Sequence, residues 1–171
     1  MKVLVIQNRV GIGDLIIFLP YIFSISKEYN IPVSLLVREN TRARELLKNN
    51  PHVNEIIILD RDDKKKTGRH QGIVGVLNLI QDLRKKNFTK TFIFNSSARY
   101  ALISKLAGIR ERYQYPLFEK KEQNIIETAK KFISVHLNKT IESNPILNID
   151  EKKILETKKN TNLIKNIVIF F

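Results

Sequence analysis

Short apolar runs alternate along the chain with longer segments in which apolar residues recur at helical spacing. The first run follows Lys2 and reads VLVI, a β-branched pattern typical of a strand buried on both faces. In a later segment the apolar residues Val76, Leu77, Ile80 and Leu83 recur at the spacing of an amphipathic helix. The pattern predicts strands at residues 2–7, 33–37, 55–59, 90–94 and 112–115, and helices at 14–29, 39–48, 73–86, 97–107 and 119–137.

Several single residues refine the predicted helix boundaries. Pro20 lies inside the first helical pattern, so that helix is expected to kink or to begin late. Asn40 or Thr41 can cap the second helix. Gly108 suits the C-terminal end of the fourth, because glycine adopts the left-handed conformation that ends many helices.

Regular alternation of strands and helices predicts an α/β fold, a Rossmann-like doubly wound parallel sheet with helices on both faces. Ligands of such sheets bind at the loops that follow the carboxyl ends of the strands. The loops to inspect are therefore residues 8–14, 60–72 and 95–99. The apolar runs are too short for a membrane-spanning helix, so we expect a soluble protein or one peripheral to a membrane.

Composition narrows the function classes. A length of 171 residues with 43% hydrophobic residues fits one folded domain and excludes wholesale disorder. The absence of cysteine excludes disulfide scaffolds, thiolate zinc sites, iron–sulfur clusters and cysteine nucleophiles, and favours a cytoplasmic location. The net charge of +13 points to anionic partners: nucleic acid, phosphorylated lipid or an anionic membrane surface. A compositional bias towards Lys, Ile and Asn is an equally good explanation of that charge.

The first loop, NRVGIGDLIIFLP, carries the sharpest motif. Gly11 and Gly13 let the backbone turn tightly, and the helix that follows offers N–H groups to an anion or a sugar. The spacing is neither the GxGxxG of dinucleotide sites nor a P-loop. Asp14 is either a helix cap or a carboxylate that acts as a general base towards a hydroxyl.

Four segments together resemble glycosyltransferase family 9, the heptosyltransferase-like enzymes. GIGDLIIFLP resembles the GDxLxxLP signature of that family. Three later segments are similar to family blocks in the same order: LLVRENTRARELLKNNPHVNEIIILD, LRKKNFTKTFIFNSSARYALISKLAGIRERYQY and EKKEQNIIETAKKFI.

The resemblance implies the N-terminal half of a GT-B fold, in which two Rossmann-like domains face each other across a cleft. It implies that this half binds an acceptor, the inner core of lipopolysaccharide, while the other half binds a nucleotide sugar such as ADP-heptose. Transfer would invert the anomeric centre without a metal ion or other cofactor. Asp14 matches the proposed catalytic base of the family, and the neighbouring Arg9, Gly11 and Gly13 are the expected substrate contacts.

The loop at residues 60–72 is rich in charge and contains RDDKKKTGRH. It reads either as a solvated loop or, by the resemblance, as a surface for acceptor phosphates and acid sugars. Arginine can bind such groups through two hydrogen bonds, whereas lysine acts as a point charge. His70 is a weaker phosphate candidate and is expected to be a surface or capping residue. The basic candidates are Arg61, Lys64, Lys65, Lys66 and Arg69.

The loop after the fourth strand supplies short polar side chains. Asn95, Ser96 and Ser97 suit either sugar hydroxyls or capping of the next helix. Arg99 aligns with a basic position of the family and is a candidate for an acceptor anion.

The C-terminal segment is expected to leave this domain. We expect residues 1–149 to form the acceptor-binding domain and residues 150–171 to form a crossing segment and the first strand, residues 167–171, of a donor domain. The donor-site residues of the family have no counterparts in the sequence. The expected partners are the lipopolysaccharide core, a missing donor domain or split partner chain, and the inner face of the inner membrane, and the chain is expected to be inactive alone.

One rival hypothesis is a basic module that binds nucleic acid or a nucleotide without catalysis. The charge favours it, but the lysines are scattered, tryptophan is absent and no RNA- or DNA-binding motif is present. The sequence therefore argues against nucleic acid as the partner.

Overall fold

The predicted alternation of strands and helices is present in a computed structural model, which describes residues 1–62, 65, 67–116 and 124–141. The elements follow in the order β1 (Val3–Ile6), α1 (Ile12–Tyr29), β2 (Val33–Val37), η1 (Glu39–Thr41), α2 (Ala43–Leu46), β3 (Val53–Ile58), α3 (Gly72–Arg84), β4 (Lys90–Ile93), α4 (Ala98–Leu106), β5 (Glu111–Gln114) and α5 (Ile125–Leu137).

The five strands form one parallel sheet in the order β3-β2-β1-β4-β5. The central strand β1 pairs with β2 on one side and with β4 on the other, so Leu4 lies opposite both Ser34 and Thr91. Strands β2 and β3 are added on one side of β1, and β4 and β5 are added on the other side, so the order of strands reverses between β1 and β4. The loops after β1 and β4 flank this reversal point. The architecture confirms the predicted Rossmann-like fold.

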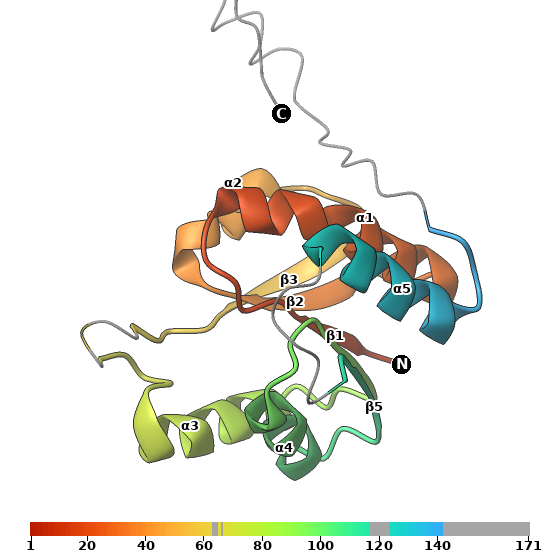
Figure 1. Cartoon of the computed structure of the whole chain (residues 1–171). Coiled ribbons are helices and arrows are strands. Elements are labelled where there is room, and N and C mark those ends of the chain that lie inside the picture. Colours follow the sequence, from red (N-terminus) through yellow and green to blue (C-terminus); the bar gives the residue numbers. More distant parts are fainter. Residues whose placement is uncertain (63–64, 66, 117–123, 142–171) are drawn as a thin grey trace, which may run out of the picture.

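Helices cover both faces of the sheet (Figure 1), and β1 contributes to both cores. Val3 and Val5 pack in the cluster formed with α1 and α5, whereas Leu4 and Ile6 pack in the cluster formed with α3 and α4. This follows from the two-residue period of a strand, and it explains why β1 is an unbroken apolar run.

Pro20 does not delay the start of the first helix, so the late start predicted from this proline is wrong. Helix α1 begins at Ile12 and continues to Tyr29. An internal proline costs about 3 kcal/mol in a helix. Burying large apolar side chains contributes about 1.5–3 kcal/mol each, and α1 buries six of them. They are Leu15, Phe18, Leu19, Tyr21, Ile22 and Ile25.

The helix predicted at residues 39–48 is broken in two. Arg42 has φ 51°, the left-handed conformation, which separates η1 from the four-residue helix α2. Thr41 lies inside η1 and is fully buried, and its hydroxyl donates to the carbonyl of Arg38 (2.6 Å). Asn40 and Thr41 are therefore not N-terminal caps of a long helix.

The C-terminal predictions fall partly outside the described residues. The helix predicted at 119–137 is present from Ile125, where the Asn124 side chain accepts from the N–H of Ile126 (3.0 Å). The boundary at 149/150, the crossing segment and the strand at 167–171 lie outside the described residues. None of the helices in the described ranges has the length and apolar character needed to cross a membrane.

Candidate functional site at the carboxyl edge of the sheet

The loop after β1 turns at Gly11, which has φ 104° and precedes the first residue of α1. Only glycine adopts this conformation readily, so the sequence signal at Gly11 has a backbone cause. Gly13 lies in the first helical turn, and a Cβ atom built on it would meet no atom within 4 Å. The space beside Gly11 and Gly13 is therefore open, and the tight turn predicted from the two glycines is present at Gly11.

Asp14 is not the cap of α1. Gly11 occupies the cap position and no side chain caps the helix, because α1 starts two residues before Asp14. The Asp14 carboxylate instead lies 3.8 Å from the Arg9 guanidinium (Oδ1 to Nη1), with 24% of its side chain exposed. A carboxylate in the first turn also interacts favourably with the helix dipole. Asp14 is thus held at the rim of the sheet and remains reachable from solvent.

Asn8 and Asn95 connect the two loops that flank the reversal point of the sheet. The Asn95 amide donates to Asn8 Oδ1 (2.9 Å), and the Asn8 amide donates to the Tyr100 hydroxyl (3.3 Å). Asn95 Oδ1 also accepts from the N–H of Ser97 (2.6 Å). The Asn95 side chain is therefore engaged in holding the β4–α4 loop.

Ser97 is the N-cap of α4, and its hydroxyl accepts from the N–H of Arg99 (3.3 Å). Of the two interpretations of Ser97, capping is the one that the geometry shows. Ser96 is half-buried in the same loop. The Arg99 guanidinium donates to the carbonyl of His70 (3.0 Å) and so ties the start of α4 to the β3–α3 loop.

Beyond the carboxyl ends of β2 and β3 lies a cavity of about 660 Å³. Its charge is mixed, because arginines and carboxylates face it together. Carboxylate and amide oxygens accept from sugar hydroxyls, and guanidinium groups bind phosphate or carboxylate. The residues that line it include Val10, Arg38, Glu39, Asn40, Asp60, Arg61, Asp62 and Thr67.

Arg38 is a site residue that the sequence analysis missed. Its Nε donates to the carbonyl of Asn8 and its Nη1 to the carbonyl of Arg61, both at 3.0 Å. One guanidinium thus joins the loops after β1 and β3 across the end of β2. The rule that ligand loops follow carboxyl ends of strands would have found it, because Arg38 directly follows the strand at residues 33–37.

Gln7 is a second missed residue. It follows β1, is fully buried, and neither polar atom of its amide has a hydrogen-bond partner among the described residues. A buried amide without partners is costly, so this group stands out at the base of the β1 loop. The sequence signal that could have identified Gln7 is its position, as a polar residue directly after the apolar strand β1.

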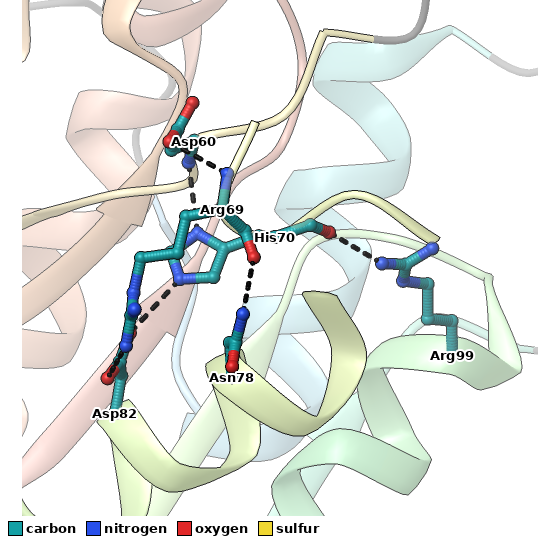
Figure 2. A network of polar contacts seen from close by, with 6 residues as sticks. All are labelled: Asp60, Arg69, His70, Asn78, Asp82 and Arg99. Atoms are coloured by element: carbon teal, nitrogen blue, oxygen red, sulfur yellow. Dashed lines mark hydrogen bonds and ion pairs between the residues drawn. The ribbon is translucent and has the colours of Figure 1, made fainter. Parts of the chain in front are cut away.

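The β3–α3 loop is held by internal hydrogen bonds, which Figure 2 shows, although Lys65, Thr67, Gly68 and Arg69 are exposed to solvent. Asp60 accepts twice, from the N–H of Arg69 at Oδ2 (2.9 Å) and from the N–H of His70 at its carbonyl (2.8 Å). The Asn78 amide of α3 donates to the carbonyl of Arg69 (2.9 Å).

Arg69 binds Asp82 of α3 through two parallel hydrogen bonds, Nε to Oδ2 at 3.1 Å and Nη2 to Oδ1 at 2.9 Å (Figure 2). The guanidinium lowers the pKa of the Asp82 carboxyl, and the carboxylate raises the pKa of Arg69. Arg69 does not line the cavity. The residue predicted to meet an acceptor phosphate is occupied by an internal carboxylate, which no feature of the helical pattern had indicated.

The prediction of His70 as a surface or capping residue is wrong. It is 4% exposed, and Nδ1 accepts from the N–H of Asp60 (3.0 Å). A backbone N–H can only donate, so Nδ1 carries no proton and Nε2 donates to Asp82 Oδ2 at 3.1 Å. Both ring nitrogens are therefore engaged inside the protein, and neither is available to a phosphate.

Arg61 is the one predicted basic residue of this loop that lines the cavity within the described part of the chain. Its Nε donates to Gln71 Oε1 (3.0 Å). Lys65 is exposed, and its N–H donates to Asp62 Oδ1 (3.0 Å). Lys64 and Lys66 lie outside the described residues. The described residues contain no group of three or more His, Cys, Asp or Glu side chains arranged to hold a metal ion.

The sequence and the structure were each compared with known proteins. The sequence matches no known family profile and no curated protein. The structure is similar to E. coli ADP-heptose lipopolysaccharide heptosyltransferase II, with a TM-score of 0.63 and 22% identity over 96% of this chain and 52% of that chain. It is similar to the glycosyl transferase family 9 structure from Veillonella parvula, with a TM-score of 0.65, 16% identity, and 95% and 50% coverage.

A third similar structure is E. coli heptosyltransferase WaaC with ADP-2-deoxy-2-fluoro heptose, with a TM-score of 0.57, 13% identity, and coverage of 85% of this chain and 51% of that chain. The chain spans about half the length of each of these structures. Identities at this level show the fold. The resemblance inferred from the GIGDLIIFLP segment is therefore confirmed for the architecture: the chain has the Rossmann-like fold of one half of a GT-B glycosyltransferase.

Proposed function

We propose that this chain is the acceptor-binding half of a heptosyltransferase-like glycosyltransferase that acts on the lipopolysaccharide inner core. The observation that carries the proposal is the position of Asp14. It lies on the first turn of α1, beside Arg9 and at the carboxyl edge of the sheet, in a chain with the fold of half a heptosyltransferase. The cavity at the same edge, which Val10 of the same loop lines, is the proposed acceptor site.

In the proposed reaction the Asp14 carboxylate accepts the proton of the acceptor hydroxyl. The hydroxyl oxygen forms a bond to the anomeric carbon of ADP-heptose, and the bond from that carbon to the phosphate oxygen breaks. ADP leaves with the bonding electron pair, and the anomeric configuration inverts. Arg9, whose guanidinium lies 3.8 Å from the Asp14 carboxylate, is the proposed residue that positions this carboxylate.

The acceptor is anionic, and Arg61 in the cavity is the proposed contact for its phosphate or acid-sugar groups. Binding of a phosphorylated inner-core oligosaccharide to the purified chain should weaken by about tenfold in Arg61→Gln. Arg110→Gln, an exposed arginine elsewhere on the chain, is the matched control and should bind normally. Equal affinities of both variants and the wild type would refute the acceptor site.

The donor site is proposed to lie in a second domain, because the chain spans half the length of the similar enzymes. We expect the 171-residue chain alone to transfer no sugar from ADP-heptose. When the chain is joined to a donor-binding half, Asp14→Asn should lower turnover by about 10²-fold or more. Turnover by the isolated chain, or near-normal turnover by the Asn variant, would count against the proposal.

A further inference from the structure

A group of large apolar side chains is exposed on α3 and α4, on the face of the sheet opposite α1 and α5. Ile73, Val74 and Leu77 of α3 are 84%, 69% and 55% exposed, and Leu102 and Leu106 of α4 are 53% and 45% exposed. Single exposed apolar residues are ordinary, whereas a contiguous group marks an interaction surface. We call these five residues the α3/α4 face.

The five side chains belong to one surface because the two helices run side by side in the same direction (Figure 1). Arg99 at the start of α4 donates to the carbonyl of His70, just before α3 (3.0 Å). Arg84 at the end of α3 donates to the carbonyl of Leu106, at the end of α4 (2.6 Å). The pairs Ile73/Leu77 and Leu102/Leu106 are each four residues apart, which places each pair on one side of its helix.

The charge around this face is strongly basic. Residues 72–110 contain seven Lys or Arg residues and one acidic residue, Asp82, whose carboxylate is bound by Arg69 and His70. Two of the seven, Lys86 and Lys90, form ion pairs with Glu55 and Glu111. Arg84, Lys85 and Lys105 are exposed, and none of them forms an ion pair within the described residues. An occupant of this face must therefore present apolar groups together with negative charge.

We propose that the α3/α4 face binds the surface of an anionic phospholipid bilayer. The apolar side chains would enter the boundary between headgroups and acyl chains, and the three basic side chains would lie among the lipid phosphates. Because α3 follows the β3 loop, its first residues lie at the carboxyl edge of the sheet, so binding brings the cavity near the headgroups.

The proposal does not depend on the chemistry of the cavity and is tested by sedimentation of the purified chain with lipid vesicles. The wild type should bind vesicles of phosphatidylglycerol and phosphatidylcholine, bind pure phosphatidylcholine much less, and release as salt increases. Ile73→Gln combined with Leu77→Gln should weaken binding about tenfold or more. Lys85→Gln combined with Lys105→Gln should weaken it to a similar extent.

Matched controls come from α5 on the opposite face. Ile126→Gln with Val135→Gln removes two exposed apolar side chains, and Lys130→Gln with Lys131→Gln removes two exposed charges. Both control pairs should bind as the wild type does. Absence of vesicle binding would overturn the proposal. An equal loss of vesicle binding in the α3/α4 variants and the α5 variants would also overturn it, because it would indicate attraction by net charge alone.

The same variants distinguish other occupants of the face. A concentration-dependent dimer in light scattering that Ile73→Gln with Leu77→Gln dissociates would assign the face to a second copy of the chain and overturn the proposal. The proposal would also be overturned if the chain bound duplex DNA but not vesicles, and if Lys85→Gln combined with Lys105→Gln abolished the DNA binding. Circular dichroism of every variant confirms that the helices are retained.

Discussion

The loops that follow β1 and β3 leave the sheet at the same edge but use their polar residues in opposite ways. The β1 loop is short and open: the Asp14 carboxylate lies at the rim, beside Arg9 and 3.8 Å from its guanidinium. The β3 loop is closed by internal bonds, and its Arg69 is held by both oxygens of Asp82. The loop with more charge in its sequence thus binds part of that charge internally, at Arg69.

Glycines show the same contrast and give the largest expected effect. A Cβ atom at Gly75 would lie 2.1 Å from the carbonyl carbon of His70, whereas one at Gly13 would meet nothing within 4 Å. Gly75→Ala should therefore lower the free energy of unfolding by at least about 3 kcal/mol. Gly13→Ala should leave it unchanged or raise it by about 0.5–1 kcal/mol. Urea denaturation of the two variants measures both, and similar values would remove the contrast.

His70 tests whether the closed loop depends on its buried imidazole. His70→Ala removes the acceptor for the N–H of Asp60 and the donor to Asp82, and leaves a cavity. We expect a loss of about 2–4 kcal/mol in the free energy of unfolding. His136→Ala on α5, an exposed residue, should cost less than half as much. If both substitutions cost the same, the imidazole does not organise the loop.

The pH dependence of stability reports on the carboxylate that closes the loop. Arg69 lowers the pKa of Asp82 in the folded state, so ionised Asp82 stabilises the fold above its unfolded pKa of about 3.9. This stabilisation is lost as the pH falls through the lower folded value. The wild type should therefore lose more stability than Asp82→Asn when the pH is lowered from 5 through the folded-state pKa of Asp82.

Urea denaturation over that range gives the comparison, with the two proteins measured in the same buffers. Parallel curves for the wild type and Asp82→Asn would mean that the bond between Arg69 and Asp82 does not persist in solution.

Asp14 should give the smallest effect on stability. It makes no capping hydrogen bond, and its interaction with Arg9 is long and partly exposed. Asp14→Asn should change the free energy of unfolding by about 0.5 kcal/mol or less. A loss above about 2 kcal/mol in thermal or urea denaturation would make Asp14 a structural residue. The β1 loop would then use its carboxylate to stabilise the fold, as the β3 loop does with its internal bonds.

The fold was predictable because its signal is local and periodic. The run VLVI identified β1, and the same logic identified β2 at its observed bounds. Errors arose where one residue overrides the local pattern. Arg42 adopts a left-handed conformation that ends η1, which no propensity for arginine indicates. Pro20 is tolerated because tertiary burial outweighs the cost of a missing hydrogen bond.

The candidate site was only partly predictable, because contacts between distant residues decide which side chains are available. Gly11 and Asp14 were identifiable from a motif within one loop. The engagement of Arg69 depends on Asp82, thirteen residues away on the next helix. Arg38 bonds to two carbonyls from different loops, and neither partner has a sequence signature.

The pairing of β1 with β4 also constrains the order in which the chain can fold. Val3 pairs with Lys90, so the first strand gains its second neighbour only after some ninety residues have been synthesised. Until then β1 is an apolar strand with one unpaired edge in the emerging chain, a state that favours association with other chains. Such long-range parallel contacts slow folding, because the connecting chain must be ordered first. Strand β1, which is central in the finished sheet, is therefore exposed to association with other chains during synthesis, while its β4 side is still unpaired.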